Sequence, residues 1–356
     1  MDRPLVSIVI NNYNYGRFLR DAIESALSQT YLPVEVIVVD DGSTDESRSI
    51  IEEYARGNKV IPVLKSNGGQ ASAFNAGFAA SRGDFILFLD ADDVLLPTCV
   101  EEALAAWREG ATKVQWRMQI VDERLRPDGR LRPEAYVTFP SGSFRYALLR
   151  WRDYPTAPTS GNLFPRQFLM NVLPIPEHLW RITADGYLNT MAGLLGDVIS
   201  LDRTLGLYRV HGDNSWTNNV INKEIWRKKA LIFKNQKELI LQWAKKHNQI
   251  PRFPFGFSSL YQLGILLKLN APVYAEEAGF SENRQVLAFK GFWAALTWPF
   301  LPWSSRLRQA LLFILAGVLP GKAASRLLIW SLYPSSRPPT LKKLLRRRHA
   351  KSGRYG

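Results

Sequence analysis

Two groups of carboxylates follow apolar segments of the chain and could bind a divalent cation. Asp40 and Asp41 come directly after the apolar run Val34–Val39, and Asp90-Ala91-Asp92-Asp93 comes after Phe85–Leu89. Carboxylates this close repel one another unless a cation or a set of hydrogen-bond donors compensates their charge. Their hard oxygen atoms suit Mg²⁺ or Mn²⁺, and a cation held there would in turn bind a diphosphate.

The elements that must position these carboxylates alternate between strand and helix. Largely apolar, β-branched runs predict strands buried on both faces; they are Val6–Ile10, Val34–Val39 and Phe85–Leu89. Val60–Leu64 predicts a further strand. Between them, Ser43 and Glu46 have the spacing of a capping box for a helix that reaches about Arg56. This alternation predicts a mostly parallel, doubly wound sheet. Ligands bind such sheets at the carboxyl ends of the strands, where helix N-termini point at them.

The pattern changes after Thr112. Val114–Val121 predicts a longer strand, and the turn signal Arg126-Pro127-Asp128-Gly129 predicts that the chain reverses there, in an antiparallel excursion. From Ile221 onward the sequence is helical and rich in aromatic residues. We therefore expect an α/β fold with a C-terminal helical appendage.

Six short motifs, in this order, resemble the family 2 glycosyltransferases of the GT-A fold over about residues 4–215. They are VSIVINNYN at 6–14, VVDDGSTD at 38–45, NGG and NAG at 67–69 and 75–77, GDFI at 83–86, and FLDADD at 88–93. The resemblance implies a hexosyltransferase-like enzyme that inverts the anomeric centre. It would move a sugar from a nucleotide-sugar donor, commonly UDP-linked, to a hydroxyl of a glycan or lipid-linked acceptor. Its cofactor would be a divalent metal, Mg²⁺ or Mn²⁺.

The resemblance also implies a role for each matching residue. Asp40 would bind the nucleotide base, Asp90 would face the ribose or donor sugar, and Asp185 would be the catalytic base. The remaining donor-binding residues would be Asn12, Tyr13 and Asn67; the metal ligands Asp92, Asp93 and His211; and the acceptor-binding residue Asn162. Three positions depart from the family pattern: Asn11-Asn12 stand where a proline usually precedes the Tyr-Asn pair, Phe74 stands where many members carry arginine, and Ala184 replaces a glutamate before Asp185. A solvated loop role for Asp185 and a structural role for His211 are the alternative interpretations.

The positive charge is concentrated at one end of the chain. Residues 220–356 contain 24 Lys and Arg against 5 Asp and Glu, whereas residues 1–219 contain 22 against 27. A basic excess at one end indicates an anionic surface partner, either lipid head groups or nucleic acid. Nucleic acid would need a fold or an aromatic platform that reads bases, and the sequence offers neither, so we expect none as a partner.

The appendage has the composition of a membrane-surface segment. The uncharged runs Gly291–Ser305 and Gln309–Gly321 contain 15 and 13 residues, which is short of the roughly 20 that a spanning helix needs. Trp293, Trp298 and Trp303 lie among basic residues, as in interfacial helices. The alternative is a helical subdomain that packs its tryptophans against the catalytic sheet. We divide the chain into a catalytic domain, 1–219, an appendage, 220–336, and a basic tail, 337–356.

The compartment and the competing functions follow from what the sequence lacks. The single cysteine, Cys99, excludes an internal disulfide, and the start of the chain has no basic n-region before its short apolar run. We expect an enzyme of polysaccharide biosynthesis for the cell envelope, in the cytoplasm and peripheral to the inner face of the membrane. A nucleotidyltransferase would carry a glycine-rich basic loop where Asn11–Arg17 stands. A non-catalytic module that binds nucleotide sugars is the other alternative.

Overall fold

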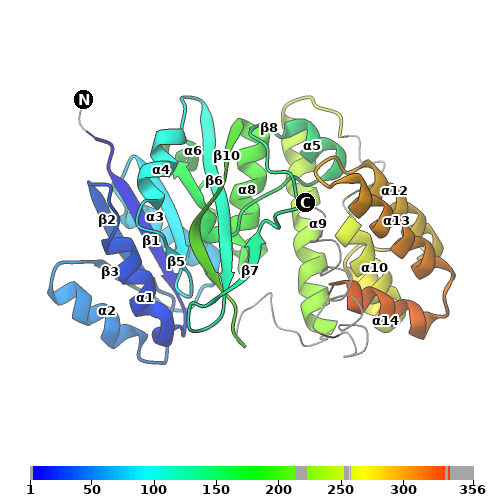
Figure 1. The fold of residues 1–356 in the computed structure, drawn as a ribbon, viewed down its shortest axis with the longest axis horizontal. Helices are drawn as coiled ribbons and strands as arrows, with labels where there is room; N and C mark the ends of the chain where they lie inside the picture. Colours follow the sequence, from blue (N-terminus) through cyan, green and yellow to red (C-terminus); the bar gives the residue numbers. More distant parts are fainter. Residues whose placement is uncertain (1–2, 213–222, 252–255, 257, 333–335, 337–356) are drawn as a thin grey trace, which may run out of the picture. The chain divides into compact units, whose positions relative to one another are not determined.

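A computed structural model describes residues 3–212, 223–251, 256, 258–332 and 336, and within them one ten-stranded sheet carries the acidic motifs (Figure 1). The strands lie in the order β3-β2-β1-β4-β9-β6-β10-β5, with β7 beside β6 and β8 beside β10. Their bounds are β1 Val6–Asn12, β2 Val34–Asp40, β3 Ile61–Leu64, β4 Phe85–Asp90, β5 Val94–Leu95, β6 Ala111–Val121, β7 Pro127–Arg132, β8 Gly142–Ser143, β9 Asn162–Pro165 and β10 Asp197–Arg209.

Parallel pairing dominates the half of the sheet that contains the first motifs. β3, β2, β1 and β4 are mutually parallel, and β10 is parallel to β6. β9 runs antiparallel to β4 and β6, and β5, β7 and β8 also pair antiparallel. The α/β fold, the mostly parallel sheet and the antiparallel excursion are therefore confirmed.

Helices cover both faces of the sheet because the parallel strands are apolar on both sides. On one face Ile8 and Ile10 of β1 join a core with α1, Gly16–Leu27, α2, Ser47–Arg56, and α4, Cys99–Ala106. On the other face, Phe88 stacks on Phe74 of α3, Gln70–Ala80, with ring centroids 4.1 Å apart. The remaining elements before residue 196 are α5 Arg145–Trp151, the 3-10 helix η1 Thr159–Gly161, α6 Arg166–Val172, α7 Glu177–Trp180 and α8 Ala184–Leu195.

The predicted capping box at the start of α2 is wrong, although the helix itself ends at Arg56 as predicted. The residue before the helix is Glu46, and neither it nor Ser43 caps the helix with its side chain. Ser43 instead faces the end of β1, where its hydroxyl accepts a hydrogen bond from the Asn14 backbone N–H at 2.9 Å. At the start of α2 it is Asp45, not Ser43, whose side chain accepts a hydrogen bond from a backbone N–H group, that of Ser47, at 3.0 Å.

The chain divides into two compact units, each described here by itself. Unit 1 comprises Met1–Gly212, Asn235–Pro254 and Pro299–Pro302, and unit 2 comprises Asp213–Lys234, Phe255–Trp298 and Trp303–Gly356. Helix α9, Lys223–Lys246, contributes to both, since Ile240, Trp243 and Ala244 belong to a core cluster of unit 1. The predicted basic tail, 337–356, lies outside the described residues.

Unit 2 is helical in the residues that the structure describes. Its helices after α9 are α10 Ser258–Asn270, α11 Pro272–Glu277, α12 Arg284–Thr297, α13 Trp303–Val318 and α14 Gly321–Leu332. Within the described part of the chain, every helix falls short of the length or the apolar character that crossing a bilayer requires.

Candidate active site

Three neighbouring strands end at the same edge of the sheet, and their last residues are the predicted donor-binding residues. In the parallel register Asn12 of β1 lies opposite Asp40 of β2, and Asn11 lies opposite Asp90 of β4. The structure therefore brings Asn12, Asp40 and Asp90 together at one edge, where ligands bind in open α/β sheets.

Asp40 is fully buried and held by donors from three directions. Asn12 Nδ2 donates to its Oδ1 at 3.2 Å, while the backbone N–H of Ser43 and Nε of Arg48 donate to its Oδ2 at 3.1 and 2.9 Å. Among the described residues no donor reaches the buried Oδ1 of Asn12. A buried acceptor without a donor is costly, so this atom offers a hydrogen-bonding position to a ligand with an N–H or O–H group.

The loops that follow β1 and β2 are joined by a hydrogen bond between Asn14 and Thr44. Asn14 has a positive φ of 58°, and its Oδ1 accepts a hydrogen bond from the backbone N–H of Thr44 at 2.8 Å. This left-handed backbone turns the chain, and asparagine is one of the residue types that tolerate it. The preceding residue, Tyr13, is 48% exposed, and an aromatic ring that is half in water is available to a planar ligand.

Asp41 shapes the loop that carries Asn67. The backbone N–H groups of Gly68 and Gly69 donate to Asp41 at 2.9 and 2.6 Å, and Lys65 Nζ lies 2.7 Å from its Oδ1. Gly69 has a φ of +88°, and a Cβ there would lie 2.4 Å from the backbone oxygen of Arg181, so glycine is required. Asn67 Oδ1 accepts a hydrogen bond from Arg181. Asn67 is thus placed by its contact with the loop before α8.

The carboxylates of Asp90, Asp92 and Asp93 form one cluster at the end of β4. Each offers an oxygen atom within 4.8 Å of the others. Burial raises the pKa of Asp90 to about 7, and the neighbouring carboxylate of Asp92 adds to the effect. Burial and the charge of Asp92 also raise the pKa of Asp93 well above its usual range. A cation would relieve both the desolvation and the repulsion.

The three carboxylates differ in their protein contacts. Asp90 Oδ1 accepts from Asn11 Nδ2 at 2.8 Å and from Gln70 Nε2 at 3.3 Å. Asp93 uses both oxygen atoms, since Ser160 Oγ donates to Oδ2 at 2.7 Å and the backbone N–H of Arg209 donates to Oδ1 at 3.0 Å. Asp93 therefore fastens the end of β4 to η1 and β10.

His211, predicted as a metal ligand, lies against Asp92. Its Nε2 is 3.0 Å from Asp92 Oδ2, and its Nδ1 is 3.3 Å from Arg17 Nη2. A guanidinium can only donate, so Nδ1 is the acceptor and the ring proton on Nε2 points at Asp92. The ring is buried against Phe18, with centroids 4.7 Å apart. In this tautomer His211 orients Asp92.

Asp185 lies in the first turn of α8, next to the carboxylate cluster. Burial raises its pKa, while the backbone N–H of Gly186 acts in the opposite direction. Gln70 connects the two regions, because its Nε2 donates to Asp90 and its Oε1 accepts from the backbone N–H of Ala184 at 3.1 Å. The charge of Asp185 contributes to the raised pKa of Asp90.

A fully buried lysine behind α8 was missed by the sequence interpretation. Lys113 Nζ donates to Asn162 Oδ1 at 2.9 Å and to Asn189 Oδ1, and Asn189 follows Asp185 by one helical turn. Burial lowers the pKa of Lys113 well below its usual range, against the effect of the Asp185 carboxylate. One sequence feature could have indicated this lysine: polar residues alternate with apolar ones along the predicted strand, at Lys113, Gln115, Arg117 and Gln119.

Asn162, predicted to bind the acceptor, is buried beside this lysine. Its Nδ2 donates to the backbone oxygen of Pro158 at 2.6 Å and to that of Thr159 at 3.3 Å. These contacts hold η1 and Lys113, so Asn162 supports the loop from within the protein.

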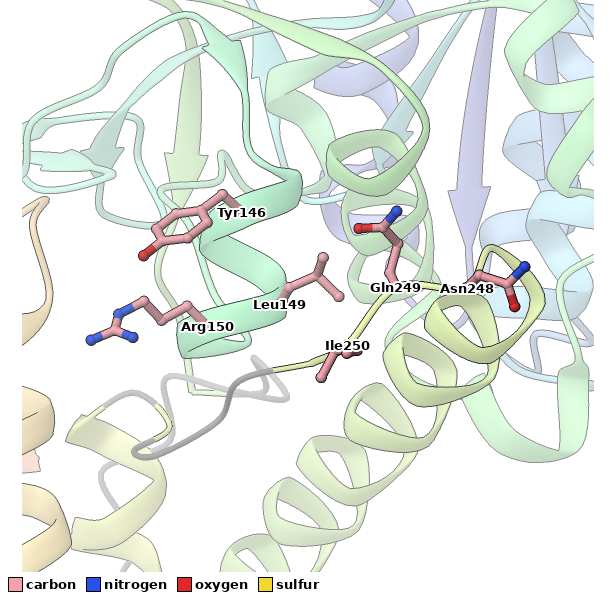
Figure 2. A pocket seen from close by; sticks show the side chains of 6 residues that line it. All are labelled: Tyr146, Leu149, Arg150, Asn248, Gln249 and Ile250. Atoms are coloured by element: carbon pink, nitrogen blue, oxygen red, sulfur yellow. The ribbon is translucent and has the colours of Figure 1, made fainter.

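A separate hollow lies elsewhere in unit 1. It has a volume of about 360 Å³ and is lined by Tyr146, Leu149 and Arg150 of α5 and by 248–250 after α9 (Figure 2). It shares no residue with the carboxylate cluster, and Tyr146 and Ile250 on its rim are largely exposed. It contributes nothing to the site at the strand ends.

Comparison with known proteins agrees with this arrangement. The model of the family described as Glycosyl transferase family 2 matches residues 7–172. An uncharacterized glycosyltransferase of Nostoc sp. is 37% identical over 216 residues, covering 59% of this chain and 66% of that protein. Chondroitin synthase of Pasteurella multocida is 37% identical over 134 residues, covering 37% of this chain and 14% of that protein. The chain thus spans about two thirds or less of these curated relatives.

A solved structure shares the fold. The crystal structure of S. aureus TarS 1–349 in complex with UDP-GlcNAc has a TM-score of 0.51 at 17% identity, and the match covers 93% of this chain and 90% of that one. The family match covers Asn12, Asp40 and the carboxylate cluster, whereas Asp185 and His211 lie beyond it. With the motifs in family order on the expected sheet, residues 7–172 of the chain match glycosyl transferase family 2.

Proposed function

We propose that the chain transfers a sugar from a nucleotide-sugar donor, UDP-linked, to a hydroxyl of a glycan or lipid-linked acceptor. The observation that carries this proposal is the placement of the buried Asp40 and the cluster of Asp90, Asp92 and Asp93 at adjoining strand ends. A base bound at Asp40 and a cation bound at the carboxylate cluster would then lie side by side, as a sugar nucleotide requires. The UDP-GlcNAc complex of S. aureus TarS, which shares the fold, supports the choice of donor.

The donor would be held by residues on both sides of the β1 end. Asp40 and the available Oδ1 of Asn12 would accept hydrogen bonds from the base and ribose, while Tyr13 would cover the base. Asp90 would face the ribose or donor sugar, and Asn67 would approach the donor from the loop that Asp41 shapes. Asp40 is already hydrogen-bonded by Asn12 and Ser43, and side chains held in this way lower the entropic cost of binding.

The carboxylate cluster fits a divalent cation, Mg²⁺ or Mn²⁺. Its oxygen atoms are hard donors within 4.8 Å of one another, and two of its carboxyl groups have raised pKa values that a cation would lower. Asp92 would be the principal ligand, with Asp93 and His211 beside it. When bound, the cation supplies charge neutralisation to the departing nucleoside diphosphate.

Asp185 would act as the general base. Its carboxylate takes the proton of the acceptor hydroxyl while that oxygen attacks the anomeric carbon, and the bond from this carbon to the diphosphate oxygen breaks on the opposite side. One displacement of this kind inverts the anomeric centre. The raised pKa of Asp185 brings the base nearer to working pH, which favours proton transfer. Asn162 would act on the acceptor side by holding η1 and Lys113 in place.

The experiment that tests the proposal is a donor panel with the purified full chain and Mn²⁺. We expect release of nucleoside diphosphate with at least one UDP-sugar in the presence of an acceptor, and loss of that release in Asp185→Asn. Thermal stabilisation by the donor without release would support a non-catalytic binding module, and release of pyrophosphate from a nucleoside triphosphate would support a nucleotidyltransferase. Either result would overturn the proposal.

A further inference from the structure

Helices α12 and α13 of unit 2 each have two apolar faces, of which one is buried. Leu287, Gly291 and Ala294 of α12 and Phe313 of α13 are buried in the core of the unit. A Cβ at Gly291 would lie 2.1 Å from Phe313 Cε1, so the two helices approach one another closely at this point. The buried faces therefore account for the folding of this helix pair.

The second apolar face of each helix is exposed, and we call the two together the outer apolar face. On α13 the residues recur at intervals of four, four, three and four, which places them along one side of the helix. Leu311 is 54% exposed and Val318 is 72% exposed. The members are Val286, Phe289 and Trp293 on α12 and Trp303, Leu307, Leu311, Ile314 and Val318 on α13. Exposed apolar side chains that line up in this way mark an interaction surface, whereas scattered ones do not.

Basic residues predominate in this part of the sequence. From Asn283 to the end, the sequence contains 14 Lys and Arg and no Asp or Glu. Arg308, Lys322 and Arg326 are exposed in the described helices, and the guanidinium of Arg306 lies 5.8 Å from the ring centre of Trp303. Lys290 of α12 pairs with Glu282. The two helices thus combine exposed apolar and aromatic side chains with an excess of basic ones.

We propose that the outer apolar face binds the surface of a bilayer that contains anionic phospholipids. Exposed aliphatic side chains would enter the boundary between acyl chains and head groups, Trp303 would lie at head-group level, and the basic side chains would contact lipid phosphates. α12 and α13 contain 14 and 16 residues, so each lies along such a surface more readily than it crosses the bilayer. The inference goes beyond the proposed transfer reaction and stands independently of it.

Electrostatics and apolar exposure favour a bilayer over a second copy of the chain or nucleic acid as the partner of this face. A second copy of the chain would bring two strongly basic surfaces together, and like charges across an interface cost free energy. Nucleic acid would satisfy the basic residues but would leave Leu311, Ile314 and Val318 against phosphates and water. An anionic bilayer accommodates the aliphatic and the basic side chains at once.

The test is flotation of the full chain with lipid vesicles. Vesicles of phosphatidylcholine alone and of phosphatidylcholine with phosphatidylglycerol are compared at 0.1 and 0.5 M NaCl, conditions that separate apolar from electrostatic binding. The test variant carries Leu311→Gln, Ile314→Gln and Val318→Gln. The matched control carries the same change at exposed apolar positions off this face, Leu32→Gln, Met170→Gln and Val273→Gln. Circular dichroism and thermal melting establish that both variants fold.

We expect the wild type and the control to float with anionic vesicles, and the test variant to lose about ten-fold or more of this binding. Fluorescence quenching by brominated lipid should fall in Trp303→Phe, which reports the depth of that ring. Three results would overturn the proposal: a wild type that stays unbound, a test variant that floats as well as the wild type, or a change of oligomeric state in the test variant without a change in vesicle binding.

Discussion

Replacing Asp90 by asparagine tests whether the carboxylate cluster is built for a cation. Asparagine keeps the shape of the side chain and the oxygen that accepts from Asn11 and Gln70. It removes the negative charge whose burial beside Asp92 raises the pKa of Asp90. In the metal-free protein we therefore expect Asp90→Asn to increase the free energy of unfolding at high pH.

The magnitude follows from the pKa. The carboxyl pKa rises from the model-compound value of 3.8 to about 7 on folding, so the folded protein binds the proton more tightly than the unfolded chain does. This tighter proton binding stabilises the folded protein. The stabilisation is fully present below pH ~4 and is lost as the pH rises to ~7. At pH 8 the loss is at most about 4 kcal/mol. Because the cluster shares its protons, we expect Asp90→Asn to recover about 1–4 kcal/mol.

The assay is urea unfolding of wild type and Asp90→Asn at pH 5 and pH 8, with EDTA and with Mn²⁺. The chain has two units, so the free energy is taken from the transition that Mn²⁺ shifts in the wild type. With EDTA, the gain should be largest at pH 8 and less than about half as large at pH 5. Mn²⁺ should then stabilise the wild type more than the variant, since the cation replaces the lost proton.

Asp197→Asn is the matched control, because Asp197 is an exposed carboxylate of the same unit. It should change the free energy of unfolding by less than about 0.5 kcal/mol at either pH. A metal-free Asp90→Asn protein that is less stable than the wild type at pH 8 would refute the reasoning. So would an equal response of both proteins to Mn²⁺.

Three further predictions concern the proposed base Asp185, His211 beside Asp92, and the basic tail 337–356. Asp185→Asn should lower kcat by about 10²–10⁴ and leave donor affinity within about two-fold in calorimetry; an unchanged kcat would remove Asp185 from the chemistry. His211→Ala should weaken Mn²⁺ binding by about 10–100-fold, since Asp92 loses the ring that orients it; equal affinity in a Mn²⁺ titration would contradict this. Deleting 337–356 should weaken binding to anionic vesicles chiefly at low salt, because that segment is strongly basic; unchanged sedimentation with vesicles would exclude the tail as a contributor.

The sequence by itself determined the parallel half of the sheet and the order of its chemistry. Val6–Ile10, Val34–Val39 and Phe85–Leu89 are largely apolar, and each is followed directly by Asn or Asp. Strands buried on both faces need such runs, and parallel strands end at a common edge. The meeting of Asn12, Asp40 and Asp90 therefore followed from local pattern alone.

Only the tertiary structure decided which partners each site residue has. Ser43 has capping-box spacing, yet it joins the loops after β1 and β2, because Asn14 offers a backbone donor that no local pattern predicts. His211 reaches Asp92 across 119 positions of the chain, and Lys113 reaches Asn189 across 76. Such contacts depend on strand order, and sequence periodicity records only which face of an element is apolar. For the same reason the sequence located tryptophans in the appendage but did not show which faces of α12 and α13 stay exposed.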